Sequence, residues 1–195
     1  HLQELQTAKK SLQTDIYGFN RTVKDTSLTY FNFIWQLNYT ILFLTVLSFF
    51  NIYKLKNATL GFANLLLNSM IVLMFLVFGL IVLGLLSSEY LNPKATDLFT
   101  FGISHIWIRY ISFVFIAALF FACYKYVKQE FLAKYVPTKV LLTVFDLGFY
   151  FSLLVIISSE LILWSDIFKI DGIYKLGLSI LFGIYALFLV VLGII

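Results

Sequence analysis

The stretch LGFANLLLNSMIVLMFLVFGLIVLGLL, residues 60–86, contains no charged residue. A helix needs about 20 apolar residues to cross the roughly 30 Å hydrocarbon core of a bilayer. Hydrocarbon offers no water to the backbone polar groups, so a run of this length and composition predicts a membrane-spanning helix. The run is longer than one span requires. We therefore expect a tilted helix or an interfacial start at Asn64 and Asn68.

The composition of the whole chain agrees with this interpretation. Of the 195 residues, 61% are hydrophobic and 12% are charged, whereas about a quarter of a soluble domain is charged. The mean hydropathy is +0.94. Aromatic residues reach 19%, which suits a lipid-facing surface with interfacial belts. Barrel strands would alternate polar and apolar residues, so the sequence predicts an all-α, polytopic helical membrane protein that contacts the lipid bilayer.

Five apolar runs define the predicted spans of a membrane domain over 33–195. They cover residues 33–53, 60–86, 106–127, 140–164 and 173–195.

A polar segment, residues 1–32, precedes these runs. Leucines at helical spacing predict a short amphipathic helix up to Tyr17, which we expect to stop at Gly18 and Asn20. The segment is expected to be a surface or re-entrant connection, with binding of an envelope protein partner as the alternative. The chain starts at His1 and stops inside an apolar run at Ile195, so we expect it to be a piece of a longer polypeptide.

Two lysine-rich loops predict the orientation. One holds Lys54 and Lys56, and the other, residues 125–139, holds four lysines against Glu130 alone. Such loops face the cytoplasm, which places residues 1–32 and Trp164 outside. The net charge of +4 is thereby explained as an orientation signal, and no nucleic-acid binding is predicted, because no basic groove or binding motif is present.

The triplet Ser-Ser-Glu ends two of the apolar runs. Its glutamates, Glu89 and Glu160, stand 71 residues apart, and each is followed by a cation near the start of the next run, Arg109 and Lys175. This order predicts a repeated helical hairpin. We expect each glutamate to pair with the cation that follows it, Glu89 with Arg109 and Glu160 with Lys175, and so to fix the hairpins.

Intramembrane acids also suggest an ion or substrate path. Asp146 and Glu160 lie within about 40° of each other on a helix, but Leu153 and Ile157 interrupt the stripe between them. We therefore favour structural anchoring. The alternatives are a transporter or carrier of a lipid-linked substrate on the Asp146/Glu160 face, or a membrane enzyme. The enzyme would need Glu89, Arg109, Glu160 and Asp166 to converge outside.

No motif predicts a cofactor, a metal ion or a catalytic residue. Zinc spacing, a phosphate-binding loop and a nucleophile elbow are absent from the sequence. His1 and His105 are far apart, and the single cysteine, Cys123, is expected to pack as a small residue. The sequence leaves it uncertain whether the chain is an enzyme.

A family resemblance rests on three segments. They are FDLGFYFSLLVIISSELILWSDIFKIDGIYKLGLSILFGIYALFLVVLGI at 145–194, IRYISFVF at 108–115 and YKYVKQEF at 124–131. They resemble the closing section of large bacterial membrane proteins in the family called domain of unknown function 2339. The resemblance implies a long bacterial chain with many spans and offers no catalytic residue to carry over. We expect a structural or envelope-associated scaffold in the bacterial inner membrane.

Overall fold

A computed structural model describes residues 2–91, 102–168, 173–191 and 193. For residues 2–25, apart from Asp15 and Gly18, and for Lys134 and Ile173 it describes the backbone alone. The described part is helical and contains no strand. Its elements are α1 (Leu2–Phe50), η1 (Asn51–Leu55), α2 (Ala58–Met74), η2 (Phe75–Gly79), α3 (Leu80–Leu91), α4 (Ser104–Val127), η3 (Glu130–Lys134), α5 (Thr138–Phe168) and α6 (Ile173–Val191).

Five segments are long and apolar enough to cross a membrane, which confirms the predicted fold class. They are Thr26–Leu55, Ala58–Leu91, Ser104–Val127, Thr138–Phe168 and Tyr174–Val191. Most of these helices extend beyond the predicted apolar runs, because helical geometry continues into interfacial residues that a search for apolar residues leaves out.

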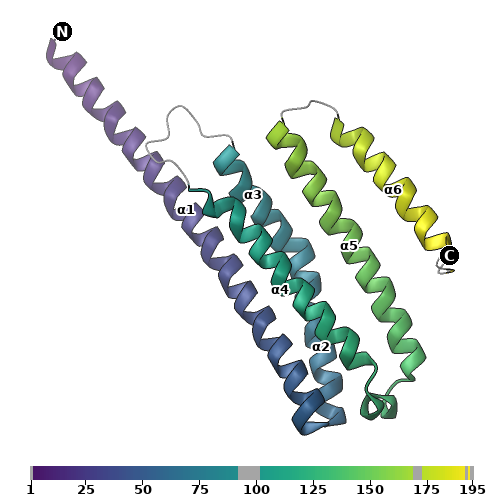
Figure 1. Cartoon of the computed structure of the whole chain (residues 1–195). Helices are drawn as coiled ribbons and strands as arrows, with labels where there is room; N and C mark the ends of the chain where they lie inside the picture. The colour runs from purple at the N-terminus through teal and green to yellow at the C-terminus, as the bar shows by residue number, and fades with distance from the viewer. Residues whose placement is uncertain (1, 92–101, 169–172, 192, 194–195) are drawn as a thin grey trace.

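The N-terminal segment differs from the prediction. The expected stop at Gly18 and Asn20 is wrong, since α1 runs without interruption from Leu2 to Phe50. A single glycine inside a helix costs only about 1 kcal/mol, and residues 1–32 contain no proline, which would cost about 3 kcal/mol. The N-terminal part of α1 consequently projects past the other helices (Figure 1).

The spans form a bundle with one peripheral helix. α1, the α2–α3 span and α4 pack against one another, α5 lies against α3 and α4, and α6 lies beside α5 at the edge (Figure 1). None of the α6 side chains that the structure describes is buried. The core of the protein therefore sits between the first three spans.

The core is formed by stripes at helical spacing. On α1, Ile34, Leu37, Ile41 and Leu44 recur every three or four residues and are at most 6% exposed. They form one cluster with apolar residues of the α2–α3 span and of α4. This spacing keeps one face of a helix on its neighbours, so the opposite face of α1 is left to lipid.

A π-helical turn, η2, interrupts the second span in its middle. The buried residues around it, Ile71, Phe75, Gly79 and Leu83, recur every fourth residue, a spacing that would drift off one face of a regular α-helix. The extra residue of the π turn absorbs that drift. Gly79 allows a close approach there, because a Cβ at this position would lie 3.0 Å from Leu37 Cδ2 and would displace it.

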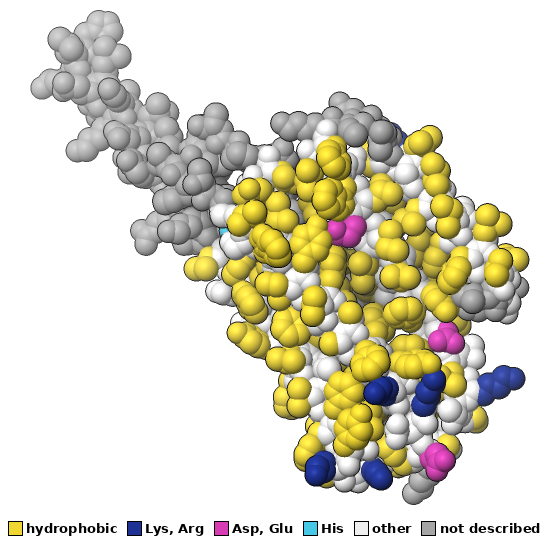
Figure 2. Space-filling model, in the orientation of Figure 1, with side chains coloured by type: hydrophobic (Ala, Val, Ile, Leu, Met, Phe, Trp, Pro, Cys, Tyr) yellow, Lys and Arg dark blue, Asp and Glu magenta, His cyan; other side chains and the backbone are white. Residues whose placement is uncertain are grey.

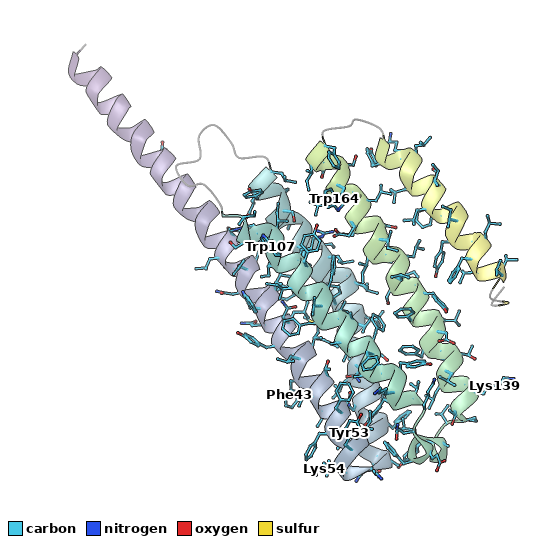
Figure 3. The ribbon with its side chains drawn as sticks, in the orientation of Figure 1. Phe43, Tyr53, Lys54, Trp107, Lys139 and Trp164 are labelled. Carbon is cyan, nitrogen blue, oxygen red and sulfur yellow. The ribbon has the colours of Figure 1, made fainter. Side chains whose placement is uncertain are left out.

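The two ends of the bundle differ in chemistry. Tyr53, Lys54 and Lys139 lie at one end, and Trp107 and Trp164 lie toward the other (Figure 3). Lysine and arginine side chains gather at the first end on the visible face (Figure 2). The two lysine-rich loops thus lie at the same end of the bundle, as the predicted orientation requires. Aromatic side chains lie at both ends, as they do at the two interfaces of a membrane.

Candidate functional site

An ion pair between Arg109 of α4 and Glu160 of α5 is the main charged contact inside the bundle. Arg109 Nε donates to Glu160 Oε1, and Arg109 Nη2 donates to Ser159 Oγ at 2.5 Å. The arginine side chain is 1% exposed and that of Glu160 is 20% exposed. The guanidinium carbon also lies 5.6 Å from the centre of the Phe113 ring. The pair therefore joins α4 to α5 through a buried cation.

The ion pair lies near the Trp107 end of α4, at the level where residue spacing predicts a membrane interface. On α4, Trp107 and Lys125 are 18 residues apart, or about 27 Å along the helix axis, close to the thickness of a hydrocarbon core. Arg109 is two residues inside the Trp107 level, and Glu160 is four residues before Trp164. Charges at this depth are desolvated enough that each requires a partner.

The predicted pairing of each glutamate with the next cation is wrong. Arg109 pairs with Glu160 of the following hairpin instead of with Glu89. Lys175 is exposed on α6, and Glu89 is partly buried with no hydrogen-bond partner for Oε2 among the described residues. The physical reason is tertiary: α4 packs on both α3 and α5, and its Arg109 side chain is directed toward α5.

The acid stripe on α5 is not enclosed by the residues that the structure describes. Asp146 is partly buried and has no ion pair with any residue that the structure describes. Leu153 and Ile157, which separate it from Glu160, are each 40% exposed. Asp166, which the enzyme alternative would require near Glu89, Arg109 and Glu160, is exposed near the end of α5. Only Arg109 and Glu160 of that four-residue set form an ion pair.

A second polar site, which the sequence did not predict, lies at the lysine-rich side of the core. Asn64 and Asn68, where the sequence analysis allowed an interfacial start as the alternative to tilt, both face the neighbouring helices, since each side chain is 1% exposed. Their Nδ2 atoms donate to Ser48 Oγ at 2.7 and 3.1 Å, and Asn68 Nδ2 also reaches Cys123 Sγ at 3.3 Å. The asparagines thus connect α2 to α1 and to α4. Cys123 is a packed residue, as predicted.

The polar core continues to the turn between α1 and α2. Asn51 Nδ2 donates to the hydroxyl of Tyr126 and to the carbonyl of Asn57, while Asn51 Oδ1 accepts from the Asn57 backbone N–H at 3.0 Å. Asn57 in turn caps α2 by accepting from the Leu60 N–H at 3.1 Å. One side chain therefore closes the turn and attaches it to α4.

Some polar atoms of the core have no hydrogen-bond partner among the described residues. They include both amide atoms of Asn38, which is 0% exposed, and the Oδ1 atoms of Asn64 and Asn68. The sequence signal for this site was the pair of asparagines one turn apart in a charge-free span. Polar groups of this kind on a buried face associate membrane helices, a role that the sequence analysis did not assign to Asn64 and Asn68.

The described residues hold no group of three histidine, cysteine or acidic side chains that could bind a metal ion. His105 lies near the start of α4, two residues before Trp107, and its Nε2 is 3.0 Å from Ser27 Oγ of α1. What these contacts accomplish chemically is the joining of helices: Ser27 with His105, Ser48 with the asparagines, and Arg109 with Glu160.

Fold and site together define the class of this protein: its described residues form an all-α bundle of five membrane-capable helices that buried polar contacts join. Comparisons of the chain with known protein families, with curated proteins and with solved structures found no match. The resemblance to the family called domain of unknown function 2339 stays a prediction.

Proposed function

We propose that this chain is a structural scaffold of a bacterial cell envelope, carried by the inner (cytoplasmic) membrane. Five membrane-capable helices support the membrane location, and the family resemblance supports the bacterial assignment. The lysine-rich end, which includes Lys54 and Lys139, is assigned to the cytoplasm by the positive-inside rule. The end that carries Trp107 and Trp164 then faces outward.

The observation that carries the scaffold proposal is the burial of Arg109. A cation that binds a substrate or stabilises a transition state must be reachable, but this side chain is 1% exposed and donates to two side chains of α5. The pair connects the three-helix core to the α5–α6 hairpin. The role that we assign to it is therefore cohesion of the bundle rather than chemistry on a ligand.

Exchanging the two charges tests this assignment. Removing one partner of a buried pair leaves the other charge uncompensated, which typically costs about 3–5 kcal/mol. Arg109→Gln and Glu160→Gln should each lower the free energy of unfolding in detergent micelles by about that amount. The double variant Arg109→Glu/Glu160→Arg should recover a large part of the loss.

Lys175→Gln is the matched control, because Lys175 is an exposed cation on α6 and should be replaceable at nearly no loss of stability. If Arg109→Gln and Glu160→Gln leave the free energy of unfolding unchanged, the scaffold assignment is contradicted. The pair would then belong to a carrier or an enzyme that uses the Asp146/Glu160 face.

The projecting part of α1 is the surface that we propose for an envelope protein partner. Residues 2–25 precede the first membrane-capable segment, which begins at Thr26. As a continuous helix they extend about 36 Å beyond it. A long polar helix outside the bilayer offers a partner protein an extended docking surface, in keeping with a scaffold.

A further inference from the structure

The lysine-rich end of the bundle carries an excess of positive charge. The turn after α1 holds Lys54 and Lys56, and residues 125–139 hold four lysines against Glu130 alone. Six lysines and one glutamate give this end a net charge of +5, whereas the whole chain has +4. On the visible face the basic side chains lie directly beside hydrophobic ones (Figure 2). Charge complementarity therefore favours an anionic partner at this end.

Two of these lysines hold their ammonium groups on aromatic rings at the surface of α4. Lys125 Nζ lies 4.9 Å from the centre of the Phe121 ring. Lys128 Nζ lies 3.8 Å from the centre of the Tyr124 ring and donates to the Tyr124 hydroxyl. Phe121 is 54% exposed and Tyr124 is 42% exposed. Each ring belongs to the residue four positions before its lysine, so both cations lie along the helix toward the middle of the span, beside apolar surface.

Neither lysine forms an ion pair with an acid of the part of the chain that the structure describes. Lys125 and Lys128 are three residues apart, so they are neighbours on one side of α4. Like charges on adjacent turns of a helix repel each other. An anion bound between the two ammonium groups would remove this repulsion.

The depth of the two lysines matches the phosphate layer of a membrane. Lys125 is 18 residues after Trp107, or about 27 Å along the helix axis, and Lys128 lies about 4.5 Å further. The hydrocarbon core of a bilayer is about 30 Å thick, and the headgroup layers extend the bilayer to about 40–45 Å. With Trp107 at one interface, the backbone of both lysines lies at the opposite boundary of the hydrocarbon core, next to the lipid phosphates.

An anionic lipid matches this surface better than other anions do. Its phosphate accepts hydrogen bonds from both ammonium groups, and its acyl chains cover the exposed faces of Phe121 and Tyr124, which a free phosphate ion would leave uncovered. A zwitterionic headgroup brings a cation of its own to the two lysines. Anionic headgroups bring no such cation, and clusters of basic residues beside a span attract them.

We propose that Lys125, Lys128 and the hydroxyl of Tyr124 bind the phosphate of an anionic phospholipid. Lysine ammonium groups bind phosphate as point charges. The Tyr124 hydroxyl accepts from Lys128 and keeps its own proton to donate to a phosphate oxygen. This site goes beyond the scaffold role and does not depend on it, because it lies at the other end of α4 from the ion pair of Arg109.

Native mass spectrometry of the whole chain in detergent micelles tests the proposal, with phosphatidylglycerol and phosphatidylcholine as the added lipids. The unmodified protein should retain phosphatidylglycerol at a concentration several-fold lower than phosphatidylcholine. Lys125→Gln/Lys128→Gln should bind the two lipids equally. Lys125→Arg/Lys128→Arg should keep the preference, since arginine retains the charge. If Lys125→Gln/Lys128→Gln fails to fold, Lys128→Gln alone, at an exposed position, should lower the preference several-fold.

Lys54→Gln/Lys139→Gln is the matched control, because it removes the same charge from the same end of the bundle (Figure 3). It should keep the preference for phosphatidylglycerol, and an equal loss in this variant would overturn the proposal by showing diffuse attraction in place of a site. Equal binding of the two lipids to the unmodified protein would overturn it as well. So would displacement of phosphatidylglycerol by inorganic phosphate beyond that by chloride of equal ionic strength, which would assign the site to a soluble anion.

Discussion

At the residue scale, the bundle depends on a few polar side chains that each serve two helices. Ser48 Oγ accepts from two asparagine side chains of α2 and donates to the Leu44 carbonyl at 2.8 Å. In hydrocarbon, few alternative partners exist for those amides. A serine that looks ordinary in the sequence therefore holds the first and second spans together.

Replacing this serine should destabilise the protein measurably. Ser48→Ala deprives Asn64 and Asn68 of a shared acceptor, and leaving buried donors unsatisfied costs about 1–3 kcal/mol. Ser69→Ala is the control, because Ser69 is exposed and bonds only to its own helix, so its loss should stay below about 0.5 kcal/mol. Denaturant unfolding in micelles measures both. Equal effects of the two variants would contradict a cross-helix role for Ser48.

Part of this residue-level description could be predicted from the sequence. The prediction singled out Glu89, Arg109, Glu160 and Lys175 as charged residues that need partners, and of these four Arg109 and Glu160 form an ion pair with each other. It assigned the wrong partners, since it paired residues that are near in the chain. Helix packing decides which of the two glutamates pairs with Arg109. The spacing of residues along the chain carries no information about that packing.

At the scale of elements, the π turn η2 keeps both halves of the second span facing the core. Residues before it, such as Asn68 and Ile71, and residues after it, such as Leu83, are buried on the same side. The π turn could not be predicted from the sequence. A span that is apolar on all sides shows no periodicity, so a shift in its register leaves no pattern in the residues.

A deletion tests the π turn. Removing Phe78, an exposed residue inside η2, should convert the turn to regular α-helix and retain the register on both sides. Removing Leu67, also exposed, should rotate Asn68 by about 100° relative to Asn64 and break the polar contacts to Ser48. We expect a folded protein in the first case and strongly reduced folded yield in the second, measured by size-exclusion chromatography in detergent. Equal yields would contradict the register argument.

At the scale of the whole molecule, side chains of the same chemical type lie at the same end of the bundle. The lysines near residues 54 and 139 lie at one end, with Trp107 and Trp164 toward the other (Figure 3). This arrangement supports a single orientation in the membrane. The predicted hairpin repeat stays a prediction: α6 lies at the edge of the bundle, whereas α4, its counterpart in the repeat, lies in the core.

Cysteine labelling tests the orientation. With a membrane-impermeant maleimide, Asp166→Cys should react in intact bacterial cells, and Lys54→Cys and Lys139→Cys should react only after lysis. The native Cys123 is buried and serves as the background control. Labelling of Lys54→Cys and Lys139→Cys from opposite sides would contradict the fold. Labelling of both in intact cells would reverse the orientation.

The sequence by itself predicted five helices that are long and apolar enough to cross a membrane, and the described residues contain five. This prediction follows from local properties, since a charge-free run such as residues 60–86 is compatible with hydrocarbon and little else. The tertiary structure alone decided that Arg109 meets Glu160 and that Asn64 and Asn68 enter the core. It also decided that residues of α2, η2, α4 and α5 line an open apolar cavity. These features depend on which faces of different helices meet, and in a membrane the apolar surface of the spans does not dictate that choice.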